Sequence, residues 1–78
     1  MHDFDYQNGN LFCEGVDLNQ LASTYGTPLY VYSENTIKDN FNRLSSALSD
    51  LDHRIAFAVK SNSNLSVLKS LNDIGADF

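Results

Sequence analysis

Alternation between strand-like and helix-like segments in the second two-thirds of the chain constrains its fold more than any other feature. The segments run in the order strand (29–32), helix (apolar stripe Ile37 to Leu51), strand (54–60), helix (Leu65 to Ile74) and the start of a strand (76–78). Strands that alternate with helices through short loops are typical of right-handed βαβ units and a parallel sheet. The sequence therefore predicts an α/β fold.

Each element of this alternation has its own local signal. The run at 29–32 is β-branched and aromatic, and 54–60 is apolar on both faces, as in a strand buried on both sides. Ser33 is a good N-cap for the first helix, and Gly75 is placed to end the second. Apolar residues at helical spacing give each helix one inner face: Ile37, Phe41, Leu44, Leu48 and Leu51 in the first, and Leu65, Leu68, Leu71 and Ile74 in the second.

Two and a half βα units cannot cover both faces of a parallel sheet. A (β/α)8 barrel needs roughly 250 residues, whereas this chain has 78. We therefore expect an incomplete domain, the first βα units of a larger α/β protein.

The first 26 residues have a different character. Asn8-Gly9 lies between two short apolar and aromatic stretches within residues 3–14, which is the strongest local signal for a β-hairpin. Asp17 then begins a short helix, with Gln20 as the second half of a capping box, and Gly26 ends it. We predict two regions: 1–26, associated with a domain outside this chain, and 27–78, part of the barrel.

Composition excludes several classes of protein. Hydrophobic residues make up 42% of the chain, as in a globular protein, and the net charge of −5 comes with scattered basic residues, which argues against nucleic acid and anionic membranes as partners. No apolar run is long enough for a membrane span, and the start resembles no signal peptide. The single Cys13 favours a reducing compartment, so we expect a cytoplasmic protein.

Lys60 is the residue with the clearest chemical potential. In a strand over 54–60, Ala56, Ala58 and Lys60 share one face, which we expect to point into a barrel interior, and the larger side chains share the other. Among small apolar neighbours, desolvation would lower the pKa of the Lys60 amine and favour the neutral form that attacks an aldehyde. A lysine at a strand end is, however, usually a solvated surface residue.

A resemblance to a known family adds to this argument. The stretch Phe57-Ala-Val-Lys-Ser-Asn62 resembles the Tyr-Ala-Val-Lys-Ala-Asn signature of the fold-type III pyridoxal-phosphate decarboxylases. Tyr25-Gly-Thr-Pro-Leu-Tyr-Val-Tyr32 is similar to the lead-in of the diaminopimelate decarboxylase branch, as are the Phe4-x-Tyr-x-x-Gly-x-Leu pattern and Asn64-Leu-Ser-Val-Leu. Phe57 and Ser61 depart from the signature, which commonly has tyrosine and alanine there.

The resemblance implies a role for two residues. Lys60 would carry pyridoxal 5′-phosphate (PLP), and Ala58 would lie against the cofactor. The implied reaction of the full-length protein is decarboxylation of meso-2,6-diaminopimelate to L-lysine, in a homodimer with an alanine-racemase-like barrel. The 78 residues alone would be inactive, because the remaining catalytic groups of the family lie later in its sequence.

Other interpretations stay open. A related fold-type III enzyme would act on ornithine, arginine, carboxynorspermidine or a D-amino acid, and a different class would be a non-catalytic PLP-binding module. For Asn62, Ser63 and Asn64, helix capping is favoured over phosphate binding. Cys13 is interpreted as a structural thiol, and neither His2 nor His53 has partners at metal-ligand spacing, so no metal site is expected.

Overall fold

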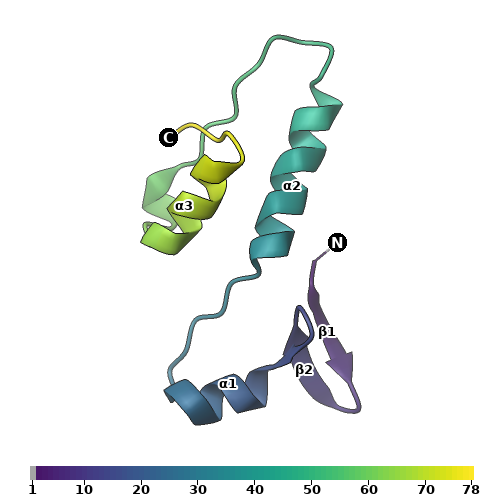
Figure 1. Ribbon diagram of the computed structural model, residues 1–78, viewed down its shortest axis with the longest axis vertical. Helices are drawn as coiled ribbons and strands as arrows, with labels where there is room; N and C mark the ends of the chain where they lie inside the picture. Colours follow the sequence, from purple (N-terminus) through teal and green to yellow (C-terminus); the bar gives the residue numbers. More distant parts are fainter. Residues whose placement is uncertain (1) are drawn as a thin grey trace. The chain divides into compact units, whose positions relative to one another are not determined.

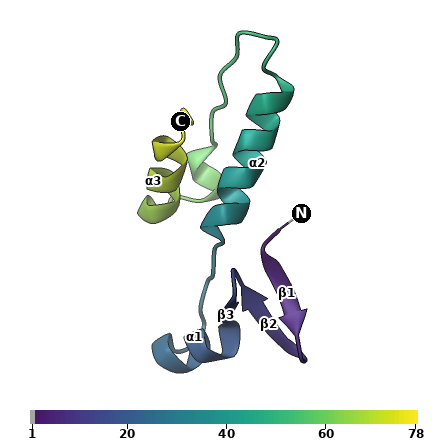
Figure 2. The ribbon, with the colours of Figure 1, turned by 45° about the vertical axis from the view of Figure 1, so that its right-hand side comes forward.

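The computed structural model describes residues 2–78, which form two compact units, Met1–Thr36 and Ile37–Phe78. In chain order the helices and strands are β1 (Phe4–Gln7), β2 (Asn10–Cys13), β3 (Val16–Asp17), α1 (Leu18–Tyr25), α2 (Glu34–Ala47), the 3-10 helix η1 (Val59–Ser61) and α3 (Leu65–Asp73). Figure 1 labels β1, β2, α1, α2 and α3, and Figure 2 also labels β3. Helix α2 begins in the first unit and continues into the second.

The predicted hairpin is confirmed in the first unit. Strands β1 and β2 pair antiparallel, with Gln7 opposite Asn10 across a two-residue turn. Asn8 and Gly9, the two turn residues, have φ values of 53° and 81°. This positive-φ pair is the geometry that Asn-Gly favours in a hairpin, because its twist matches that of the strands.

A second tight turn comes directly after β2 and was not predicted. Glu14 and Gly15 have φ values of 51° and 81° and bring β3 back against β2, as Figure 2 shows. Glutamate is not among the residues that favour positive φ, so Gly15 is the only sequence signal for this turn. The turn fixes the position of the Glu14 carboxylate at the end of β2.

Helix α1 begins and ends as predicted. The Asp17 carboxylate accepts a hydrogen bond from the Asn19 amide at 2.9 Å, which caps the first turn. Gly26 has a φ of 82° and its N–H donates to the Ala22 carbonyl at 2.8 Å. The reciprocal contact expected from Gln20 is absent from the hydrogen bonds of residues 2–78, where Gln20 is exposed.

The strand predicted at 29–32 is wrong for this chain. No residue between 2 and 78 pairs with this segment, and its side chains are largely exposed, with Tyr30 at 83% of its full accessible area. A strand needs a neighbour for its backbone N–H and C=O groups, and the local β propensity of an aromatic run does not supply one. Tyr30 and Tyr32 are therefore not core residues in this chain.

The second unit has a small apolar core. Val67, Leu71 and Ala76 are buried, and four half-buried side chains pack against them: Ile37, Phe41, Phe57 and Ile74. The predicted inner face of α3 is partly wrong, since Leu65 is 81% exposed. The inner face runs through the buried Val67 and Leu71 to the half-buried Ile74, at spacings of four and three, and Leu65, in the first turn, lies outside this stripe.

Parallel pairing of the second and third predicted strands is confirmed at one bridge. Ala56 pairs with Asp77 in parallel, with the Phe57 N–H donating to the Asp77 carbonyl at 2.8 Å. The Asp77 N–H in turn donates to the Ile55 carbonyl at 2.9 Å. Beyond this bridge the expected strand over 54–60 does not continue, because η1 begins at Val59.

Parts of the unit remain uncovered. The stripe on α2 is half-buried at Ile37 and Phe41, but Leu44 is 50% exposed, and Leu51 lies beyond the end of the helix at 64%. Uncovered apolar positions and a single parallel bridge are what an incomplete α/β domain presents. The boundary between the two units falls between Thr36 and Ile37. The boundary predicted from the sequence, between residues 26 and 27, concerns a longer protein and stays a prediction.

Candidate functional site

Lys60 lies at the centre of the 3-10 helix η1, just beyond the bridged segment 55–57. Two backbone hydrogen bonds close this turn. The Ser61 N–H donates to the Ala58 carbonyl at 2.9 Å, and the Asn62 N–H donates to the Val59 carbonyl at 3.1 Å. The lysine is therefore presented by a short helical turn and not by the last residue of a strand.

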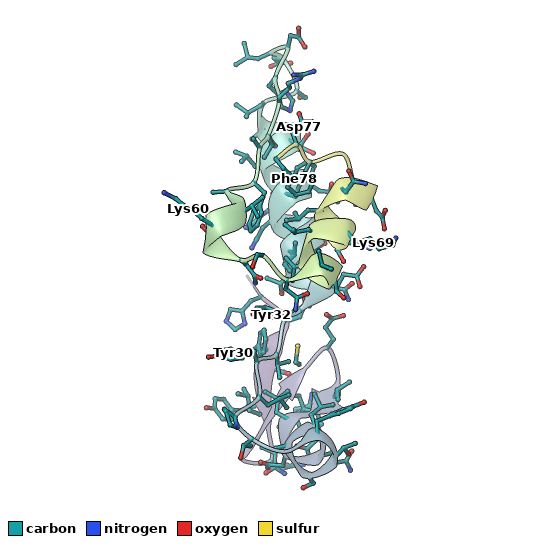
Figure 3. The ribbon with its side chains drawn as sticks, turned by 90° about the vertical axis from the view of Figure 1, so that its left-hand side faces the viewer. Tyr30, Tyr32, Lys60, Lys69, Asp77 and Phe78 are labelled. Carbon is teal, nitrogen blue, oxygen red and sulfur yellow. The ribbon has the colours of Figure 1, made fainter. Side chains whose placement is uncertain are left out.

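The side chain of Lys60 extends away from the ribbon into open space, as Figure 3 shows. Arg54 and Lys69 are in ion pairs, with Asp77 at 3.8 Å and with Asp73 at 2.9 Å. By contrast, no hydrogen bond or ion pair joins the Lys60 ammonium to any other residue in the described part of the chain. An incoming group could therefore reach the Lys60 side-chain nitrogen without breaking a contact within residues 2–78.

The predicted desolvation of Lys60 is not present within residues 2–78. The side chain is exposed, so no group within residues 2–78 shields it from water. The preceding residues Ala56 and Ala58 are small and exposed, so they do not cover the Lys60 side chain. Any desolvation of the amine must come from groups outside these residues.

The alternation of side chains before Lys60 is confirmed up to residue 58. Ile55 and Phe57 are half-buried, and Phe57 packs against the core, whereas Ala56 and Ala58 are exposed. Val59 departs from the alternation, because the backbone has already entered η1. Ala56 and Ala58 have small, exposed side chains, and Lys60 has no hydrogen-bond or ionic partner within residues 2–78, so these residues leave room for a cofactor that reacts through an aldehyde.

Asparagine side chains hold the loop after Lys60. The Asn62 Oδ1 accepts a hydrogen bond from the Asn64 amide at 2.9 Å. The Asn64 Oδ1 accepts from the Ser66 and Val67 amides at 2.9 and 3.2 Å, which makes Asn64 the N-cap of α3. Capping, the interpretation favoured from the sequence, is confirmed for Asn64, and both side-chain acceptors are already in use.

A second polar cluster, which the sequence did not predict, lies in the first unit at the start of α2. Ser33 is buried, and its hydroxyl donates to the Glu14 carboxylate at 2.8 Å and lies 3.4 Å from a carboxylate oxygen of Asp3. The same hydroxyl oxygen accepts from the Thr36 amide at 3.1 Å, as expected of an N-cap. The Thr36 hydroxyl donates to Asp3 at 2.8 Å. The cluster joins the hairpin to the first turn of α2.

Cys13 lies buried beside this cluster. Burial raises the pKa of its thiol, and the negative charge of Glu14 raises it further; the hydrogen bond with Ser33 acts in the opposite direction, and the charge of Asp3 adds the smallest upward effect. The thiol is thus kept protonated, which supports the structural role expected from the sequence.

Among residues 2–78, no group of three or more His, Cys, Asp or Glu side chains is arranged to hold a metal ion. No helix within the described range is both long and apolar enough to cross a membrane.

Comparison with known proteins gives consistent matches in both sequence and structure. No protein-family model matches the chain. Diaminopimelate decarboxylase of Pseudomonas fluorescens is 46% identical over 78 residues, and that of Aquifex aeolicus is 49% identical over 72 residues, or 92% of this chain. The chain belongs to the diaminopimelate decarboxylase family. It corresponds to an amino-terminal segment of these enzymes.

Solved structures support the same membership. A structure of diaminopimelate decarboxylase from M. jannaschii in complex with L-lysine matches 99% of the chain with a TM-score of 0.89 and 34% identity. A structure from Aquifex aeolicus matches 95% of the chain with a TM-score of 0.87 and 47% identity. The fold predicted from the sequence, an incomplete α/β domain of this family, is thereby confirmed.

The matched part of each relative is small. The chain spans 19% of the length of the Pseudomonas fluorescens enzyme and 20% of the M. jannaschii chain. The activity, substrate and assembly of a whole protein that contains this segment are therefore matters for proposal.

Proposed function

We propose that Lys60 binds PLP covalently in the longer protein, and that this protein decarboxylates meso-2,6-diaminopimelate to L-lysine. The observation that carries the proposal is the Lys60 side chain itself, which is exposed, has no ionic partner in residues 2–78 and follows two small, exposed residues, Ala56 and Ala58. Family membership supports the reaction, and the signature around Lys60 supports its role.

The residues of this chain would contribute binding and orientation. Lys60 would hold the cofactor covalently through its side-chain nitrogen. From the resemblance, Ala58 would lie against the cofactor, and its small, exposed side chain is compatible with this role. Bound PLP supplies the electron sink that receives the electron pair left when CO₂ departs from the substrate.

The choice of substrate rests on the relatives. The enzymes of Pseudomonas fluorescens and Aquifex aeolicus are named diaminopimelate decarboxylases, and the M. jannaschii structure is a complex with L-lysine, the product of that reaction. Ornithine, arginine, carboxynorspermidine and D-amino-acid decarboxylation are the enzymatic alternatives, and a PLP-binding module without catalysis is the non-enzymatic one. Assembly as a homodimer stays a prediction of the resemblance, and residence in the cytoplasm stays a prediction from the composition of the chain.

The test uses the full-length protein with added PLP. We expect the visible absorption band of the bound cofactor in the wild type and its loss in Lys60→Ala. Lys60→Arg is the matched control, because it keeps the positive charge but cannot condense with an aldehyde, so it should also lack the band. An unchanged spectrum in both variants would overturn the role of Lys60.

Substrate is tested on the same preparation. Release of CO₂ is measured from meso-diaminopimelate, ornithine and arginine in parallel. The proposal expects release from diaminopimelate with a kcat/KM well above that for the other two. A preference for ornithine or arginine would move the protein to a related decarboxylase, and cofactor binding without any CO₂ release would favour the non-catalytic module.

A further inference from the structure

We propose that Asn62 is a positioning residue for Lys60. This inference rests on the proposed function, because it assigns Asn62 a role in presenting the amine that reacts with the cofactor. The observation behind it is the hydrogen bond from the Asn64 amide to the Asn62 side-chain oxygen at 2.9 Å. It forms two residues after the reactive lysine and ties its turn to the start of α3.

The turn that carries Lys60 has few other supports. The last hydrogen bond to the neighbouring strand is made by the Phe57 N–H, three residues before the lysine. The Lys60 side chain itself contributes none, because it forms no hydrogen bond or ion pair within residues 2–78. The direction in which the side chain leaves the main chain, the Cα–Cβ bond of Lys60, is therefore set by the backbone on either side of it.

On the upstream side the backbone is fixed by Phe57, which bonds to Asp77 and packs against the core. On the downstream side, the backbone bonds that close η1 only link neighbouring residues within the turn. The Asn62 side chain restrains the next part of the loop, because it accepts a hydrogen bond from the Asn64 amide immediately before α3 begins. An asparagine that bonds the backbone two residues later mimics a backbone turn and restricts the loop.

Asn62 and Asn64 act on different parts of the loop. The Asn64 side chain caps α3 through the Ser66 and Val67 amides, so its loss affects the helix. The bond to Asn62 uses the backbone N–H of Asn64, which persists when the Asn64 side chain is removed. This difference supplies a matched pair: Asn62→Ala removes the link to the lysine turn, while Asn64→Ala removes the cap and keeps that link.

The experiment measures how fast Lys60 acquires the cofactor in the full-length protein. Cofactor-free enzyme is mixed with PLP, borohydride is added at set times to reduce the C=N bond, and the modified Lys60 peptide is quantified by mass spectrometry. Asn62→Ala should load roughly threefold to tenfold more slowly, the effect of losing one neutral hydrogen bond. Asn64→Ala should load at the wild-type rate although it lowers thermal stability.

Rescue distinguishes positioning from general loss of structure. Asn62→Asp keeps the acceptor at position 62 and should restore the rate. Ser63→Asp is the control for the added negative charge, since it places the charge at the neighbouring position. Amide exchange at Asn64 should be faster in Asn62→Ala and close to wild type in Asn62→Asp.

The outcomes separate this inference from the proposed function. If the wild type acquires no cofactor at Lys60, the proposed function fails. If the wild type loads at Lys60 and Asn62→Ala loads equally fast, only the positioning role fails. Equal slowing in Asn62→Ala and Asn64→Ala would also overturn it, because the effect would then come from the start of α3.

Discussion

The carboxylate of Glu14 joins the end of β2 to the first turn of α2, and its removal tests how firmly the hairpin is held there. It accepts a hydrogen bond from the buried Ser33 hydroxyl at 2.8 Å and another from the Asn35 amide at 3.3 Å. We predict that Glu14→Ala weakens this attachment and exposes the first turn of α2 to solvent.

The magnitude follows from these two bonds. A hydrogen bond to a charged group contributes about 1.5–3 kcal/mol. Since Glu14 is exposed and the Asn35 bond is long, the combined effect should lie at the lower end, about 1–2 kcal/mol. Local opening of the first turn should then be more frequent by a factor of roughly 5–30.

The assay is amide hydrogen exchange at Asn35 and Thr36 in the full-length protein. The Thr36 amide is a sensitive reporter because it donates to Ser33, the residue that Glu14 holds. Asp5→Ala is the matched control, since this exposed carboxylate in the same hairpin accepts a hydrogen bond only from the side chain of Gln7 among residues 2–78. Unchanged exchange in Glu14→Ala, or equal acceleration in Asp5→Ala, would refute the reasoning.

Three further predictions concern the core, the thiol and a helix cap. Leu71→Ala should lower the free energy of unfolding, measured by chemical denaturation, by about 2–5 kcal/mol, because it leaves a cavity at a buried position of the second unit. A loss no larger than that caused by Leu65→Ala, at an exposed position, would contradict this prediction. Cys13 should react slowly with iodoacetamide at neutral pH, because its raised pKa keeps the thiol protonated, and the rate should rise only at pH values above the ordinary range for cysteine. Because the pKa of the thiol is higher in the folded than in the unfolded protein, its contribution to the free energy of unfolding should be constant below the unfolded-state pKa and should fall as pH rises above it. Rapid alkylation at neutral pH would count against the buried thiol. Asn64→Ala should cost about 1 kcal/mol through loss of the α3 cap, and a melting temperature equal to that of wild type would show that the cap is not formed.

Local signals predicted the parts of the fold that depend on local chemistry. Asn8-Gly9 forms the hairpin turn, and Asp17 and Asn64 cap the helices they precede. Each of these residues acts on backbone groups within a few positions, so no distant partner is needed. The turn at Glu14-Gly15 was missed because only one of its two residues favours positive φ.

Features that depend on distant partners could not be predicted in the same way. The segment 29–32 has the composition of a strand but has no neighbour in residues 2–78 to complete one. On α3, Leu65 and Val67 are both apolar, and only packing against α2 and the bridged segment decides that Val67 is buried. Periodicity alone does not fix which of two adjacent stripes faces the core.

The same division holds for the candidate site. The placement of Lys60 after small residues was predictable, since the alternation of side chains before it is a property of extended backbone. The cluster around Ser33 was not, because it brings together Asp3 and Glu14 from two ends of the hairpin through a turn without a strong signal. Desolvation of Lys60 depends on groups outside the described residues, so neither the sequence nor the fold of this segment determines it.

The central claim is that the Lys60 amine binds the cofactor, and peptide mapping tests it most directly. The full-length protein is saturated with PLP, reduced with borohydride and digested, and every lysine-containing peptide is examined for the added pyridoxyl group. We predict that the modification is found on Lys60. Modification of Lys38, Lys69 or a lysine elsewhere in the protein, with Lys60 unmodified, would contradict the account.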